Sequence, residues 1–155
     1  LPKLRGHPMA AGLSLPTENI DLFRAKLNRQ QTLTEKELTP VTWIDVPMPV
    51  SYASKKLVEQ LRVLEPFGKG NEKPVFADRK LTVRSANMIG KNKNVLKMQL
   101  EDTQGHVVDA IQFKVEEEDM PLRGKEISIV YYPDINEFRG NQTLQFIVQE
   151  WCYTT

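Results

Sequence analysis

The chain after residue 74 alternates short apolar segments with turn residues, and this alternation limits the folds open to it. We expect β-strands near residues 75–89, 95–101, 107–113, 126–132 and 143–151. The stretches between them, 90–94, 102–105, 133–136 and 140–141, are rich in the turn-favouring residues Gly, Asn, Asp and Pro. Segments this short cannot satisfy their backbone hydrogen bonds alone, so they must pair with one another in a sheet.

The stretch 114–123 separates the third and fourth of these strands and has room for a helical turn. Five strands with a helical element between the third and fourth are the outline of an OB-fold barrel. A generic small β-barrel would show much the same spacing. The predicted fold class is therefore mainly β with helices (α+β), built around a five-stranded OB-fold barrel.

Helical patterns precede these strands. Thr17 is the expected N-cap of a first helix, whose apolar stripe consists of Ile20, Phe23 and Leu27. After this helix we expect a polar connector at residues 33–40 and a short strand at 41–46.

A second helix is expected next, with Ser51 or Ser54 as its N-cap. Pro66 stops it, because proline cannot continue a helix. The residues expected on its buried face are Leu57, Leu61 and Leu64.

The composition excludes several classes of protein. The chain has 155 residues, a length typical of one domain, and a formal net charge of +1, which excludes a histone-like polycation. The single cysteine, Cys152, is expected to be buried, excludes a disulfide framework, and points to a reducing compartment such as the cytoplasm. No apolar run approaches the roughly 18 residues of a membrane span. Because the chain begins at Leu1 rather than Met, we expect a piece of a longer protein.

Residues 79–100 form a basic span with six cations and no Asp or Glu. Its centre falls on the loop between the first two predicted strands, and Phe138 and Arg139 lie on the loop between the last two. These loops flank the oligonucleotide-binding face of OB-folds, where cations follow the phosphates and aromatic rings stack on bases. A solvated strand face with a Lys/Asn hairpin tip explains the span equally well. The residues assigned to nucleic acid are Lys69, Arg84, Lys91, Asn92, Lys93, Asn94, Lys97, Phe138 and Arg139.

The segment 5–12, Arg-Gly-His-Pro-Met-Ala-Ala-Gly, is a candidate site for substrate phosphate. Gly6 permits close approach of the backbone, His7 can donate to a phosphate oxygen, and Arg5 can pair with it bidentately. Composition alone favours a plainer explanation, a tight turn that leads into a core segment.

A hydrolytic metal site is not expected in this chain. Such a site needs several convergent Asp, Glu or His ligands, yet His7 and His106 are the only histidines. The acidic residues 116–119 are consecutive, so their side chains fan outward. We therefore expect no hydrolysis by this chain alone.

Most aromatic residues of a small barrel belong to its core. Tyr131 and Tyr132 are adjacent in a predicted strand, so they face opposite sides and at most one of them is free for a ligand. Trp43 and Trp151 are expected to be packing residues.

Residues 5–12 resemble the G-G-H-x-x-A-A-G signature of the DHH-associated domain of DHH phosphoesterases, with Arg5 where the first glycine is usual. The stretches 64–71, 74–76, 90–94 and 135–140 resemble the C-terminal part of the bacterial RecJ family, which are 5′→3′ exonucleases specific for single-stranded DNA. The similarity covers nearly the whole chain.

This resemblance implies a remnant of the DHH-associated α/β domain at 1–32, a connector at 33–42, and an OB-fold nucleic-acid-binding domain at 43–155 with a helix at 51–65. A DHH domain outside this chain would hold Mn²⁺ or Mg²⁺ and hydrolyse phosphodiester bonds, whereas Gly6 and His7 would help to hold substrate phosphate. No cofactor is implied for this chain itself. The implied partners are single-stranded DNA and single-stranded-DNA-binding protein or other repair proteins, in DNA repair and recombination.

Two alternatives stay open. The chain is also compatible with an interaction module that docks a repair protein through apolar residues near 47–52. It is equally compatible with an RNA-binding OB module, which a contact to the 2′-hydroxyl would distinguish.

Overall fold

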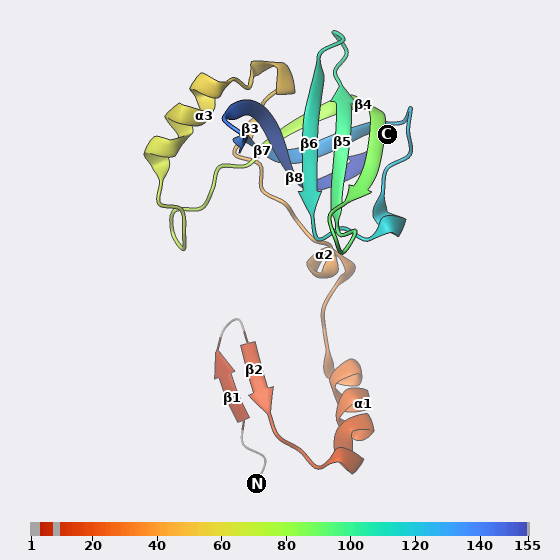
Figure 1. The fold of residues 1–155 in the computed structure, drawn as a ribbon. Helices are drawn as coiled ribbons and strands as arrows, with labels where there is room; N and C mark the ends of the chain where they lie inside the picture. Colours follow the sequence, from red (N-terminus) through yellow and green to blue (C-terminus); the bar gives the residue numbers. More distant parts are fainter. Residues whose placement is uncertain (1–3, 8–9, 155) are drawn as a thin grey trace. The chain divides into compact units, whose positions relative to one another are not determined.

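The computed structural model describes residues 4–7 and 10–154, with side chains from residue 11 onward. The chain divides into two compact units, Leu1–Thr42 and Trp43–Thr155 (Figure 1). In the first unit, β1 (Leu4–His7) and β2 (Ala10–Leu13) form an antiparallel pair. The helices of this unit are α1 (Ile20–Gln30) and the single turn α2 (Glu35–Leu38).

The first unit differs from the sequence-based expectation at both of its helices. Thr17 is not a helix cap, because the extended backbone of Pro16 starts a 3-10 turn in which Thr17 is already the first residue. The predicted polar connector contains α2. Thr34 Oγ1 accepts the Glu37 N–H, and Glu37 Oε2 accepts the Thr34 N–H at 2.8 Å, which together form a capping box.

The second unit is built around five strands that close into a ring (Figure 1). These strands are β4 (Phe76–Ile89), β5 (Val95–Glu101), β6 (Val107–Phe113), β7 (Glu126–Phe138) and β8 (Asn141–Tyr153). Their order is β4-β5-β6-β8-β7, and β7 pairs back onto β4. Neighbours in the ring are antiparallel, except for the parallel pair β6 and β8. The predicted fold class is thus confirmed.

β4 pairs with β7 through its first half and with β5 through its second half, so it has to bend. Its register shifts between Asp78 and Leu81, where Lys80 has a φ of 61°, and again between Val83 and Ser85. Such bulges insert an extra residue and increase the local twist. β4 can therefore pair with both β5 and β7, which closes the ring.

The strand boundaries show where the pattern succeeded and where it failed. The bounds predicted for β5 and β6 match the structure. The predicted turn at 133–136 is wrong, because β7 continues through Pro133 and turns only at Arg139 and Gly140. β4 pairs with β7 no further than Tyr131, so the missing N–H of Pro133 breaks no ladder bond on that side.

The strand predicted at 41–46 is also wrong in extent. Only β3 (Val46–Pro47) forms, and it pairs in parallel with the first residues of β4. The residues before it do not reach a partner strand, so the paired part is only two residues long.

Alternate residues of the five strands fill the interior of the ring, as expected for pleated strands. Tyr131 is fully buried there, and its ring centroid lies 6.0 Å from that of Phe76 and 5.2 Å from that of Phe146. Each fully buried side chain of this size contributes roughly 1.5–3 kcal/mol. The other interior residues with 0–1% exposure include Leu81, Val83, Leu96, Met98, Leu100, Ile127 and Ile129.

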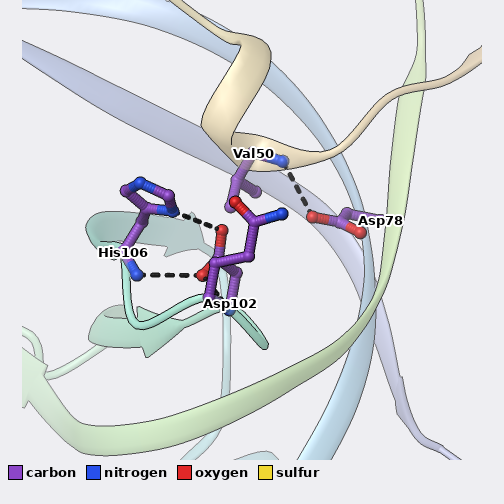
Figure 2. A network of polar contacts seen from close by, with 5 residues as sticks. Val50, Asp78, Asp102 and His106 are labelled. Carbon is purple, nitrogen blue, oxygen red and sulfur yellow. Dashed lines mark hydrogen bonds and ion pairs between the residues drawn. The ribbon is translucent and has the colours of Figure 1, made fainter.

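Hydrogen bonds hold the segment before α3 against the ring, and two of them involve side chains of the ring. The Val50 N–H donates to Asp78 Oδ2 at 2.8 Å (Figure 2), and Val50 is 1% exposed. Tyr131 Oη donates to the Met48 carbonyl at 2.8 Å. Burial, reinforced by the charge of Asp78, raises the pKa of Tyr131 far above its usual range, so this hydroxyl remains a neutral donor.

The second helix is shorter than the predicted range 51–65. α3 (Lys55–Leu61) begins after Ser54, whose Oγ accepts the Leu57 N–H at 3.2 Å. The flanking residues form separate 3-10 turns at Val50–Tyr52 and Arg62–Leu64. Because Ser54 caps the helix and Ser51 does not, the helix starts four residues later than its predicted start.

The buried face of α3 also differs from the prediction. Val58 is 1% exposed, although it was not expected on this face, whereas Leu64 is 47% exposed. Lys55 Nζ donates to the Gln142 carbonyl at 2.6 Å, which joins the start of α3 to the start of β8.

The predictions for Trp43 and Cys152 are corrected, whereas those for the two tyrosines and Trp151 agree with the structure. Tyr131 and Tyr132 are both buried, and Lys73 Nζ lies 3.9 Å from the centre of the Tyr132 ring, so neither tyrosine is free for a ligand. Trp151 packs against the core as expected, but Trp43 is 84% exposed because it precedes the paired strands. Cys152 is exposed rather than buried, since it lies on an outward position of β8.

We predict that Tyr131→Phe lowers the free energy of unfolding by about 1–2 kcal/mol, because the Met48 carbonyl loses its donor in a partly buried place. Urea unfolding followed by circular dichroism measures this change. Tyr52→Phe is the control, since Tyr52 is 75% exposed and the change should leave the midpoint unaltered. Equal midpoints for Tyr131→Phe and the unsubstituted chain would contradict the structural role of this bond.

Candidate nucleic-acid interface

The outward side chains of β5 and β6 form a face between two hairpins, here called the outer face. Because Leu96 and Met98 point into the ring, Lys97 between them points outward. The register places Lys97 between Asn87 of β4 and Ile111 of β6. The residues of the outer face are Val95, Lys97, Gln99, Asp109, Ile111 and Phe113.

One end of the outer face is formed by the hairpin 90–94, which joins β4 to β5. Phe113 pairs with Val95 at its base and is 54% exposed. The Val115 N–H donates to the Asn94 carbonyl at 3.1 Å, so the chain after Phe113 is tied to this hairpin. An exposed aromatic ring therefore lies next to a hairpin that carries Lys91 and Lys93.

A second hairpin joins β7 to β8, whereas the far end of the outer face itself is closed by the loop 102–106 between β5 and β6. Phe138 pairs with Asn141, and the two residues between them are Arg139 and Gly140 with φ values of 51° and 79°. Two positive φ angles in a two-residue loop are typical of a type I′ turn, which favours Asn-Gly. Phe138 is 64% exposed, and Arg139 Cζ lies 5.1 Å from the centre of its ring.

Four non-glycine residues in the described part of the chain have positive φ, and all four are Lys or Arg. They are Lys80, Lys93, Lys114 and Arg139. The left-handed conformation costs an L-residue other than glycine roughly 1–2 kcal/mol, and Asn or Asp tolerates it better. Lys93 and Lys114 lie at the end of the outer face formed by the hairpin 90–94, and Arg139 lies in the β7–β8 hairpin. Cations thus occupy turn positions for which local stability favours another residue.

The structure places five of the predicted nucleic-acid residues on the outer face and the hairpin 90–94, namely Lys91, Asn92, Lys93, Asn94 and Lys97. Phe138 and Arg139 lie in the separate β7–β8 hairpin. The one carboxylate of the outer face, Asp109, accepts from Gln99 Nε2 at 3.4 Å.

Two predicted residues lie elsewhere. Arg84 Nη1 lies 2.7 Å from Glu101 Oε2, at the end of β5 remote from the hairpin 90–94, so its charge is already paired. Lys69 lies in a tight turn closed by reciprocal backbone bonds of 2.9 and 3.0 Å between Gly68 and Asn71. This turn follows α3, away from β5 and β6 (Figure 1).

The candidate phosphate residues Arg5, Gly6 and His7 form part of β1. Their side chains lie outside the described part of the chain, so the predicted phosphate contact stays a prediction.

The sequence analysis did not assign Phe113 and Lys114 to the interface. Strand alternation carries the missing signal, because Ala110 faces inward and Phe113 is therefore on an outward position. Hydropathy alone suggests the opposite orientation, because the polar Gln112 points inward and the aromatic Phe113 points outward.

The loop between β5 and β6 is organised by Asp102. Its Oδ1 accepts N–H bonds from Gln104 at 2.8 Å and His106 at 2.9 Å, and its Oδ2 lies 2.9 Å from His106 Nδ1 (Figure 2). Burial acts to raise the pKa of the Asp102 carboxyl, but the hydrogen bonds and the His106 charge outweigh it, so the pKa is lowered.

We predict that the stabilising effect of Asp102 is lost in acid. Because the folded-state pKa is lowered, the ionised carboxyl stabilises the fold above the unfolded pKa of about 3.9, and this contribution disappears as pH falls through the folded pKa. Asp102→Ala should therefore lower the melting temperature at pH 7, and the difference from the unsubstituted chain should shrink below pH ~3.9. Glu59→Ala is the control, with little expected effect at either pH. A difference independent of pH would contradict this account.

Among the side chains that the structure describes, from residue 11 onward, no group of three or more His, Cys, Asp or Glu is placed to hold a metal ion. Nor does any helix within that part of the chain have the length and apolar character needed to cross a membrane.

The strand order of the ring, with its single parallel pair, defines an OB-fold domain. Residues 44–150 match the RecJ OB domain family, and the chain belongs to this family.

Curated relatives match almost the whole chain. It is 37% identical over 150 residues to the single-stranded-DNA-specific exonuclease RecJ of Haemophilus influenzae, covering 94% of this chain and 26% of that protein. It is 31% identical to the protein of that name from Bacillus subtilis, covering 97% of this chain and 19% of the relative. The chain therefore spans about a quarter or less of the length of these relatives.

A solved structure supports the fold. The crystal structure of RecJ from Thermus thermophilus in complex with Mn²⁺ superposes with a TM-score of 0.68 at 18% identity. The match covers 99% of this chain and 22% of the Thermus chain.

Proposed function

We propose that this chain binds single-stranded DNA across the outer face, as the DNA-binding region of a RecJ-like 5′→3′ exonuclease. The observation that carries the proposal is the placement of cations at strained turn positions on both hairpins, next to the exposed rings of Phe113 and Phe138. We further propose that it acts in DNA repair and recombination in the bacterial cytoplasm. The matched relatives, which are named as single-stranded-DNA-specific exonucleases, support this proposal.

The outer face supplies the two kinds of contact that single strands need. Lys91, Lys93 and Lys97 can follow the phosphates, since cations neutralise the backbone without reading its sequence. Phe113 and Phe138 offer exposed rings on which bases can stack, and each stacked base is worth about 1–3 kcal/mol. Exposed rings favour a single strand over a duplex, because the bases of a single strand are free to stack on them.

We propose that cleavage itself belongs to the parts of the relatives that this chain does not span. In that division of labour Arg5, Gly6 and His7 hold the substrate phosphate, and a metal-binding domain with Mn²⁺ or Mg²⁺ hydrolyses the phosphodiester bond. Single-stranded-DNA-binding protein and other repair proteins are proposed as partners of the whole protein.

We predict that the triple variant Lys91→Ala, Lys93→Ala and Lys97→Ala binds a labelled oligo-dT more weakly than the unsubstituted chain. Each phosphate contact to a single strand contributes about 0.7 to the slope of log affinity against log salt, so the slope should fall by about 2. Fluorescence anisotropy at several salt concentrations measures both quantities. With Mn²⁺ added, gel analysis should show the oligonucleotide intact.

The matched control removes the same charge from other parts of the second unit, through Arg79→Ala, Arg123→Ala and Lys125→Ala. We expect this variant to keep the affinity and most of the salt slope. If both triple variants lost affinity equally, binding would reflect total charge and not the outer face. Stronger binding of a matched RNA oligonucleotide would instead favour the RNA-binding alternative.

We predict opposite effects of Arg139→Asn on stability and binding. Asn-Gly suits the type I′ turn better than Arg-Gly, so the free energy of unfolding should rise by about 0.5–1 kcal/mol while oligo-dT affinity falls. Arg139→Gln is the control, because it removes the charge, and glutamine tolerates the positive φ angle no better than arginine does. It should lose affinity without gaining stability, and unchanged affinity in both variants would exclude Arg139 from the interface.

The protein-docking alternative based on residues 47–52 stays a hypothesis. In this stretch Val50 is 1% exposed and Met48 packs against the core, whereas Pro47, Pro49 and Tyr52 are exposed.

A further inference from the structure

The last residues of β8 have a strand partner on only one side in the described part of the chain. β7 pairs with β8 as far as Tyr153, whereas the pairing of β6 with β8 stops at Gln112 and Val148. β6 ends one residue later, at Phe113, so it offers no partner to the residues of β8 that follow Val148. The stretch of β8 from Gln149 to Tyr153 is therefore a sheet edge, here called the β8 edge.

Backbone groups at this edge point away from β7. The Thr154 N–H donates to the Glu126 carbonyl on the β7 side, and antiparallel ladders bond through every second residue. The N–H and C=O groups of Trp151 and Tyr153 therefore point toward the open side. Among the described residues, no backbone hydrogen bond reaches these groups from that side.

A groove lies along the β8 edge, between it and the segment that links β6 to β7. In Figure 1 this segment runs beside the C-terminal end of the chain. The hollow measures about 490 Å³, and its apolar lining includes Val115, Met120 and Trp151. Gln112 also lines it, and Gln112 Oε1 is a buried acceptor with no hydrogen-bond partner. The groove thus combines apolar contacts with unpaired polar atoms.

The rim of the groove is acidic. The linking segment carries four consecutive exposed carboxylates at residues 116–119, and Glu118 and Asp119 line the groove directly. Lys114 is the single cation among the lining residues. A phosphate backbone would be repelled here, and a second copy of the chain pairing through the same edge would bring two acidic rims together. Charge complementarity therefore favours a basic partner.

We propose that the β8 edge binds an extended basic peptide segment of a partner protein, which adds a strand beside Trp151 and Tyr153. Main-chain hydrogen bonds to an exposed edge supply affinity, and the alternate side chains of the added strand supply specificity. Lys or Arg side chains on one face of the peptide would meet Glu118 and Asp119. Small apolar side chains on its other face would pack against Val115 and Met120. This site is separate from the outer face proposed for DNA.

The proposal is tested with the full chain and a fluorescein-labelled peptide of alternating lysine and valine. We expect saturable binding by anisotropy and slower hydrogen exchange of the Trp151 and Tyr153 amides in the complex. A peptide of alternating glutamate and valine should not bind. A lysine–valine peptide N-methylated at alternate residues, in both registers, should also lose binding, because it cannot form the ladder.

The charge contribution is tested with the double variant Glu118→Gln and Asp119→Asn. Two lost ion pairs at an exposed rim should weaken the peptide affinity by roughly fivefold. The matched control is Glu59→Gln with Glu72→Gln, which removes two exposed carboxylates outside the groove and should leave the affinity unchanged.

Three results would overturn the proposal. The first is peptide binding that survives N-methylation in both registers, which would mean charge attraction alone. The second is an equal loss of affinity in the two double variants. The third is displacement of the peptide by oligo-dT, since the β8 edge and the outer face would then not be separate sites.

Discussion

The double pairing of β4 is the constraint on which the rest of the structure depends. One strand serves both β7 and β5 because bulges at Lys80 and Arg84 let it turn between them. This closure gives β5 and β6 an inside, which is packed with apolar residues, and an outside, which is available to a ligand. The hairpin 90–94 and the β7–β8 hairpin hold their positions because the strands that lead into them are fixed in register.

The strands were the most predictable part of the chain. Residues 95–101 and 107–113 were predicted with their observed bounds, because period-two alternation and Gly- or Asn-rich turns agree there. The continuation of β7 through Pro133 could not be predicted from sequence, since proline normally marks the end of a strand. Only the tertiary pairing shows that β7 has already left β4 when it reaches this residue, so the missing N–H is harmless.

The candidate interface was predictable in its charge but not in its detail. A span with six cations and no acid identified the hairpin 90–94 and Lys97, which the structure places on the outer face. Sequence could not show that Glu101 pairs with Arg84, because these residues meet only through the register of β4 and β5. Sequence hydropathy also could not show that Phe113 is exposed, because at the end of β6 the polar Gln112 points inward and the apolar Phe113 points outward.

The two proposed surfaces meet in one short piece of backbone. Phe113 belongs to the outer face, Lys114 takes a left-handed turn position, and Val115 both lines the groove and donates to the Asn94 carbonyl of the hairpin. A substitution at Val115 would therefore disturb both surfaces and would not separate them. Glu118 and Asp119 line the groove, while the neighbouring Glu117 lines a small pocket together with Lys93 of the hairpin 90–94. The formal net charge of +1 thus conceals two adjoining surfaces of opposite sign.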